Sequence, residues 1–189
     1  MIKKTGQTIV EVLIALFVIS VGLYGAMSLM ISNDFLQSQN KKNLVMMNLA
    51  REALEIVQNK RDSNWLANAN FAQGILDGPN CTAVTDWDGG SYPSFDFSVN
   101  DLENARLKIN HSESTIIEHR NGTDISYYRL LTFSAICQNK NDVTDKVFSS
   151  DCSCPSNYKV VGVRSKVDVG YKDNGWKKIT IYSDLYDWR

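Results

Sequence analysis

The sequence predicts an α+β fold, in which one long N-terminal helix packs on a C-terminal antiparallel β-sheet. An apolar run near the N-terminus predicts the helix, and short segments of alternating apolar and polar residues in the second half predict the sheet. With 189 residues, 43% hydrophobic and 22% charged, the chain can form one compact domain with an appendage. Because 20 Lys and Arg residues balance 21 Asp and Glu residues without any block of like charges, we expect no nucleic-acid partner.

The first expected element is a membrane-spanning helix. Residues Val12–Ile31 carry no charge, and about 20 such residues are enough for a helix to cross the ~30 Å apolar layer of a bilayer. Lys3 and Lys4 precede this run, which places the N-terminus in the cytoplasm and the residues after Ile31 outside. A cleaved secretory signal peptide is the alternative, but its apolar part is typically only about 7–15 residues long.

Glu11 stands at the entrance of the apolar run, where a carboxylate is costly unless it has a partner. We therefore regard Glu11 as a candidate functional residue. The alternative, which the residues leave open, is that the carboxylate reaches the headgroup layer and stays hydrated there.

The residues Lys3–Leu16 read KKTGQTIVEVLIAL. They resemble the class III leader of type IV prepilins and pseudopilins, which combines a short basic leader, a Gly before the cleaved bond, a Glu as the fifth residue after it, and an apolar helix. The resemblance implies that a membrane-embedded aspartyl prepilin peptidase cleaves between Gly6 and Gln7 and methylates the new N-terminal amine. Residues 19–23 look most like minor pilins of the PilV type. Gln7 departs from the family, in which Phe is commonest at this position, and no Pro interrupts the apolar helix.

The same resemblance implies a role for Glu11 and a set of partners. In pilus-like filaments the corresponding Glu is thought to meet the N-terminal amine of a neighbouring subunit, which here would be the amine of Gln7. The implied partners are prepilin peptidase, other pilin subunits, the pilus assembly platform, and membrane lipid before assembly.

The implied function is that of a structural, minor subunit of a type IV pilus or of a type II secretion pseudopilus. Such a subunit is first a single-pass protein of the cytoplasmic membrane, with its N-terminus inside, and then part of an extracytoplasmic filament. The alternative is a filament-displayed or membrane-tethered binding module that serves adhesion or DNA uptake.

The helix is expected to continue beyond the membrane to about Arg61. Apolar residues recur there at helical spacing and form one stripe, which consists of Met46, Leu49, Ala50, Ala53, Ile56 and Val57. Lys60 and Arg61 suit a helix C-terminus, and Asp62-Ser63-Asn64 supplies stop chemistry. The chain is therefore expected to comprise a cleaved leader (1–6), a transmembrane and assembly half of the helix (7–31), an amphipathic half (32–62) and a β-rich head (63–189).

Residues 63–98 are expected to form a loop-rich connector, because Asn, Gly and Pro punctuate short apolar pieces. Strands are then expected at 106–110, 115–119, 126–136, 160–169 and 176–182. Asn121-Gly122 predicts a hairpin between the second and third of these strands, and the turn at 172–175 predicts a hairpin between the last two. The result is an antiparallel sheet of about four or five strands with one apolar face for the helix.

The sequence contains no catalytic constellation, so we expect no enzymatic activity and no cofactor. The two histidines, His111 and His119, are expected at solvated strand or loop positions. Residues Asp86–Gly90 resemble half of a calcium loop, but the remaining ligands are missing and a plain turn is favoured. The aromatic residues near the sheet are expected to pack in or around the core, with a ligand platform as the alternative.

The four cysteines, Cys81, Cys137, Cys152 and Cys154, are expected to form disulfides, because their domain is expected to face an oxidising compartment. Zinc binding is the alternative, but the Cys-x-Cys spacing is unusual for structural zinc, and we expect no metal. Four cysteines allow three pairings, of which Cys152 with Cys154 is sterically strained. Cys81 and Cys137 are therefore each expected to join one member of the Cys-x-Cys pair, and both choices remain open.

Overall fold

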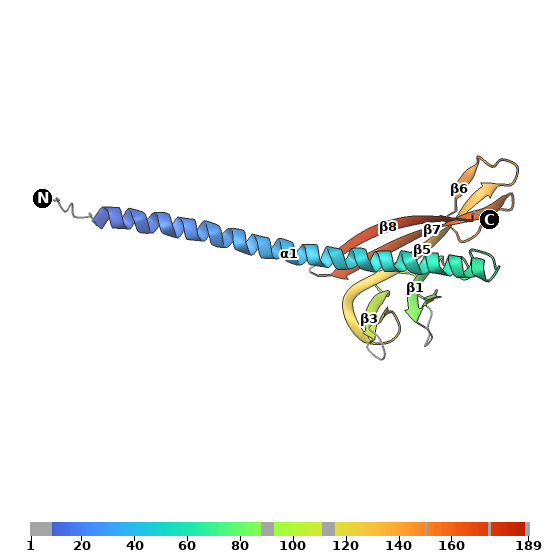
Figure 1. Ribbon diagram of the computed structural model, residues 1–189, viewed down its shortest axis with the longest axis horizontal. Helices are drawn as coiled ribbons and strands as arrows, with labels where there is room; N and C mark the ends of the chain where they lie inside the picture. Colours follow the sequence, from blue (N-terminus) through green and yellow to red (C-terminus); the bar gives the residue numbers. More distant parts are fainter. Residues whose placement is uncertain (1–8, 88–92, 111–115, 150, 174, 188–189) are drawn as a thin grey trace. The chain divides into compact units, whose positions relative to one another are not determined.

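The computed structural model describes residues 9–87, 93–110, 116–149, 151–173 and 175–187. Within these ranges the predicted α+β class is confirmed: one N-terminal helix, α1 (Ile9–Leu66), contacts a C-terminal antiparallel β-sheet (Figure 1). The chain divides into two compact units, residues 1–44 and 45–189, so the first part of α1 belongs to one unit and the second part to the other.

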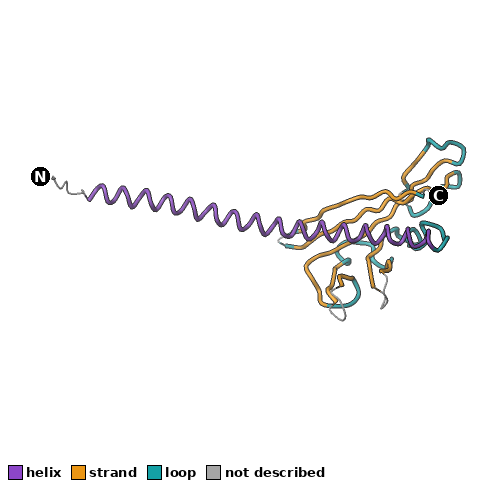
Figure 2. Tube along the Cα trace, in the orientation of Figure 1, coloured by secondary structure: helices purple, strands orange, loops and turns teal. Residues whose placement is uncertain are grey.

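Eight described strands belong to the second unit (Figure 2). They are β1 (Thr82–Trp87), β2 (Pro93–Asp96), β3 (Arg106–Asn110), β4 (Ile116–Glu118), β5 (Thr123–Asn139), β6 (Lys146–Phe148), β7 (Tyr158–Lys172) and β8 (Trp176–Tyr186). The expected number of four or five strands is therefore wrong. The additional strands are β1 and β2, which lie inside the expected connector, and β6, whose three side chains are all exposed.

Strand β5 is the centre of the sheet. One of its edges pairs with β7 along the register from Tyr127 opposite Tyr171 to Asn139 opposite Tyr158. Its other edge is shared in succession by three short strands, β3, β1 and β6. Strand β7 also pairs with β8, and β8 pairs with no other described strand, so β8 is one edge of the sheet.

The two expected hairpins have different outcomes. The β7–β8 hairpin is confirmed, with Lys172 opposite Trp176 and with Gly175 at a φ of 136°, a region that favours glycine. The hairpin at Asn121-Gly122 is wrong, because β4 and β5 do not pair with each other and instead flank β3. The turn passes so close to β3 that a Cβ on Gly122 would lie 2.3 Å from the carbonyl oxygen of Ile109. A glycine is therefore needed at position 122, because the chain between β4 and β5 passes too close to the backbone of β3 for any side chain.

The expected apolar stripe of α1 is buried and packs on the sheet. Met46, Leu49, Ala50, Ala53 and Val57 share one core with inward side chains of β5, β7 and β8, which include Leu131, Phe133, Val163, Val167, Val169 and Leu185. Alternation along each strand selects these residues, since successive side chains point to opposite faces. Each large apolar side chain that is fully buried contributes about 1.5–3 kcal/mol. This core fixes the second part of α1 against the sheet.

Helix α1 ends at Leu66, five residues beyond the expected end at Arg61. The reason is that Asn64 faces inward, where its amide donates hydrogen bonds to the carbonyls of Phe71 (3.0 Å) and Gln73 (2.7 Å). The stop is supplied by Asn68, which adopts a left-handed φ of 54°. The N–H of Asn68 then donates to Trp65 and that of the next residue to Asn64, the Schellman pattern that closes many helices.

Candidate functional site

The described part of the first unit is a helix with an apolar surface. Between Val12 and Ile31 every large apolar side chain is exposed, from 47% at Val12 to 80% at Tyr24. The segment is long and apolar enough to cross a membrane, by length and composition. The hydroxyl of Ser20 donates to the carbonyls of Leu16 (2.6 Å) and Phe17 (3.0 Å), so this polar group is satisfied inside the helix. Such a surface needs either lipid or other apolar helices around it.

Glu11 is the one charged residue of the described segment 9–31. It lies in the first turn of α1 and its side chain is exposed. Gly6 and Gln7, the residues of the expected cleavage site, lie outside the described residues.

The four cysteines of the head form two disulfides. Cys81 is bonded to Cys152 and Cys137 to Cys154, with Cα–Cα distances of 5.5 and 5.6 Å. This pairing selects one of the two choices that the sequence leaves open. Both bonds anchor the segment after β6, whose Asp151 carbonyl also accepts a hydrogen bond from Ala135 on β5. Since all four sulfurs are in disulfides, none is a thiolate ligand for zinc.

An ion pair between a fully buried arginine and a partly exposed glutamate, which the sequence analysis missed, joins the sheet to the helix. Arg129 on β5 is 0% exposed; its Nη1 lies 3.2 Å from Oε2 of Glu52 and donates to the carbonyl of Leu49 at 3.1 Å. Its Nη2 donates to the hydroxyl of Thr85 on β1. Burial lowers the pKa of Arg129, and the Glu52 carboxylate acts in the opposite direction. The sequence does contain an indication of this burial. Side chains alternate between the two faces of a strand, so Arg129 lies on the same inward face as Leu131 and Phe133.

Asp86, the described carboxylate of the calcium-like sequence, takes part in an ion pair inside the fold. Asp86 is 1% exposed and its Oδ2 lies 2.8 Å from Nε of Arg120, which also lies near Asp96. A backbone hydrogen bond from Ser98 is the largest cause that lowers the pKa of Asp96, and Arg120 adds to it. Residues 88–90 of the calcium-like sequence lie outside the described residues. In the described ranges, no group of three or more His, Cys, Asp or Glu side chains is arranged to hold a metal ion.

The remaining candidates have internal contacts as well. Nδ1 of His119 lies 2.8 Å from the carbonyl of Arg106, and His111 lies outside the described residues. Trp176 packs edge-on against Tyr128 with ring centroids 4.8 Å apart, and its Nε1 donates to Glu103. These two rings therefore pack against each other across β7, between the central strand β5 and the edge strand β8.

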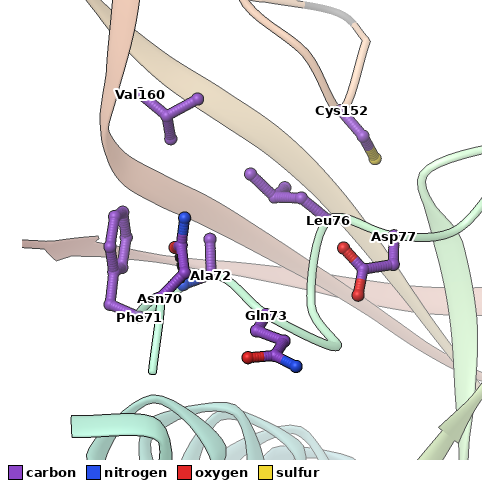
Figure 3. A pocket seen from close by; sticks show the side chains of 8 residues that line it. All are labelled: Asn70, Phe71, Ala72, Gln73, Leu76, Asp77, Cys152 and Val160. Carbon is purple, nitrogen blue, oxygen red and sulfur yellow. Dashed lines mark hydrogen bonds between the residues drawn. The ribbon is translucent and has the colours of Figure 1, made fainter. Parts of the chain in front are cut away.

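A hollow of about 380 Å³ lies beside the Cys-x-Cys segment (Figure 3). Its lining includes Phe71, Leu76 and Val160, together with polar side chains and Cys152. The polar groups serve the loop itself: Asp77 accepts from the N–H of Gly74 at 2.7 Å, and Asn70 accepts from the N–H of Ala72 at 2.9 Å. The hollow therefore presents no pair of groups suited to acid–base or nucleophilic chemistry.

No protein-family model, curated protein or solved structure matches this chain. The structural class of the protein is therefore judged from the arrangement of its helix and sheet. A long apolar N-terminal helix whose second part packs on a C-terminal antiparallel sheet is consistent with a pilin-like fold. In the head, the Arg129–Glu52 ion pair connects α1 to β5. The two disulfides connect the Cys-x-Cys loop to Cys81 and to Cys137 on β5.

Proposed function

We propose that the protein is a structural, minor subunit of a type IV pilus or of a type II secretion pseudopilus. The observation that carries this proposal is the exposed, uncharged surface of α1 from Val12 to Ile31, which directly follows a sequence that resembles a prepilin leader. A helix of this kind serves twice. It holds the chain in the cytoplasmic membrane, and it then packs among the same helices of other subunits.

Glu11 acts in the step from membrane to filament. Cleavage after Gly6 removes Lys3 and Lys4 and creates a positive amine at Gln7, about 6 Å along the helix from Glu11 at 1.5 Å per residue. The Glu11 carboxylate of one subunit pairs with this amine of its neighbour, which neutralises two charges in an apolar surrounding. Breaking such a pair on one side leaves an uncompensated charge and costs about 3–5 kcal/mol. The pair therefore sets the register in which helices join.

The head takes part as a rigid, non-enzymatic body. The apolar stripe of α1 and the Arg129–Glu52 pair support this role, since both connect the second part of the helix to β5. The partners are prepilin peptidase, which processes the chain, then other pilin subunits and the assembly platform. The two disulfides suit a head that faces an oxidising compartment.

The test is the intact mass of the full chain from a bacterial host with and without prepilin peptidase. We expect the peptidase to remove six of the 189 residues and to leave 183, beginning at Gln7. Gly6→Leu should stay at full length in both hosts. Gly25→Leu is the matched control: it also adds a Leu in place of a Gly, and nothing lies within 4 Å of a Cβ there, so it should be processed normally. A wild-type chain that begins at Met1 beside active peptidase, or beyond Ile31, would refute the assignment.

A further inference from the structure

The connectivity of the two disulfides is interleaved. In chain order the cysteines are Cys81, Cys137, Cys152 and Cys154, and the structure bonds the first to the third and the second to the fourth. The two bonded loops therefore overlap, and no bond joins cysteines that are consecutive in the sequence. If cysteines are oxidised in the order in which they are exported, the first bond to form is therefore not a native one.

The order follows from the proposed function, on which this inference rests. A chain that inserts with its N-terminus inside exports the head after α1, so Cys81 and Cys137 reach the oxidising side before Cys152 and Cys154. A thiol oxidase that carries a reactive disulfide can then oxidise this first pair. The two thiols lose two electrons and two protons, the disulfide of the oxidase is reduced to a dithiol, and a Cys81–Cys137 bond forms.

The folded head excludes this bond. The carbonyl of Cys81 accepts a hydrogen bond from the N–H of Phe133, and Thr82 pairs with Thr132, so Cys81 lies beside the middle of β5. Cys137 lies four residues further along β5, which is about 13 Å at ~3.3 Å per residue. A disulfide requires Cα atoms within about 7 Å. A chain with the Cys81–Cys137 bond therefore cannot pair β1 with β5.

We propose that this chain is a substrate of thiol–disulfide isomerisation, and that its partner is a disulfide isomerase kept in the reduced dithiol state. A thiolate of the isomerase attacks the sulfur of Cys81 in the Cys81–Cys137 bond, and Cys137 leaves as a thiolate. The Cys152 thiolate then attacks the sulfur of Cys81 in the mixed disulfide, which forms the native bond and releases the isomerase thiolate. No electrons are lost or gained in this exchange. A second oxidation by the oxidase joins Cys137 to Cys154.

Burial explains why catalysis must come before the head closes. In the folded head Cys137 is 0% and Cys81 is 8% exposed, whereas Cys152 and Cys154 are only partly buried. An attacking thiolate can therefore reach the sulfur of Cys81 only while β1 is undocked from β5. In that state β1 also exposes its apolar residues, which include Ala83 and Val84. An isomerase that binds extended apolar segments would recognise this strand directly beside the bond.

The experiment is a pulse-chase of the full chain in two bacterial hosts that both have the envelope thiol oxidase and differ only in the disulfide isomerase. Free thiols are blocked at each time, and disulfides are mapped from non-reduced peptides. With the isomerase the native pairs should dominate. Without it we expect a Cys81–Cys137 species and native pairs that form roughly tenfold more slowly, since uncatalysed rearrangement takes minutes to hours.

Two double variants are matched controls. Cys81→Ser with Cys152→Ser leaves only Cys137 and Cys154, and Cys137→Ser with Cys154→Ser leaves only Cys81 and Cys152. Each remaining native pair is now consecutive, so its oxidation should be equally fast in both hosts. Equal rates of native pairing for the wild type in both hosts, without a Cys81–Cys137 species, would overturn isomerisation alone. Four free thiols in both hosts would overturn it together with the proposed location of the head.

Discussion

Glu52 and Arg129 give the sharpest test of how the helix is fixed to the sheet. Glu52→Gln keeps the shape of the side chain and removes its charge, so the fully buried guanidinium of Arg129 loses its counter-ion. Breaking a buried pair from one side costs about 3–5 kcal/mol. Because the Glu52 side chain is 38% exposed and Arg129 keeps its bond to the carbonyl of Leu49, we expect a smaller loss, about 2 kcal/mol.

Removing the buried charge itself, by Arg129→Met, should lower the free energy of unfolding less than Glu52→Gln does. Arg129→Met fills most of the same space, and Glu52 is then free to meet water. The main loss is the hydrogen-bond partner of the buried Thr85 hydroxyl, for which about 1 kcal/mol is expected. The double variant should equal Arg129→Met within error, because the carboxylate has no role once the guanidinium is absent. The coupling free energy of the cycle is then about 2 kcal/mol.

The assay is thermal unfolding of the full chain in detergent micelles, followed by near-ultraviolet circular dichroism. For the unit of residues 45–189, a loss of 2 kcal/mol corresponds to a midpoint lowered by about 6 °C. Glu55→Gln is the matched control, since Glu55 is exposed on the same helix and should leave the midpoint unchanged. The reasoning is refuted if Glu52→Gln behaves like this control, or if Arg129→Met is the more damaging of the two changes.

Two further predictions concern the filament and the pH dependence of the head. Glu11→Val should insert in the membrane at least as well as the wild type and be absent from sheared filaments, as measured by fractionation; equal incorporation would contradict the intersubunit pair. Arg164 donates two hydrogen bonds of 2.7 Å to Asp184, and they lower the pKa of Asp184 below its ordinary value of 3.8. The ion pair therefore stabilises the folded head fully above about pH 4, and this contribution is lost as the pH falls further. The midpoint difference between wild type and Asp184→Asn should therefore be constant near neutral pH and shrink below pH 4; a difference that persists in acid would exclude this ion pair as its cause.

The long elements of this fold could be predicted from the sequence because their signals are local. The stripe of α1 repeats at helical spacing, and β5, β7 and β8 are long runs of strand-forming residues. Strand β1 was not predicted because it is buried on both faces. Ala83 faces the main core, and Val84 packs with Leu130 in a second cluster. It therefore lacks alternation, and the burial of Asp86 within it depends on Arg120, a partner far along the chain.

Pairing was predicted less well than conformation. The backbone does turn at Gly122, with a φ of 115°, but the strand next to β5 is β3. Leu107 of β3 is 1% exposed in the core, a long-range contact that local turn residues do not encode. The disulfides show the same limit. Strain in a bond between Cys152 and Cys154 reduces three pairings to two, and the final choice depends on where β1 and β5 place their cysteines. Of the candidate site, Glu11 and the cleavage residues remain predictions, and Arg129 was accessible only through strand parity.

The unpaired edge of β8 could pair with the same edge of a neighbouring chain where chains are crowded together. If the chains are anchored in one membrane, as proposed, they meet at high effective concentration and with the same orientation. An open strand edge then favours pairing between neighbours. If two β8 strands met in parallel and in register, Lys177 and Lys178 of one chain would lie beside the same lysines of the other, which opposes pairing by like-charge repulsion. Replacing both lysines with threonine would remove this repulsion. It would also remove the Lys178 Nζ that lies 3.5 Å from Oδ1 of the buried Asp168, which keeps its contact with Lys166. We expect the double variant to form insoluble aggregates where the wild type stays dispersed.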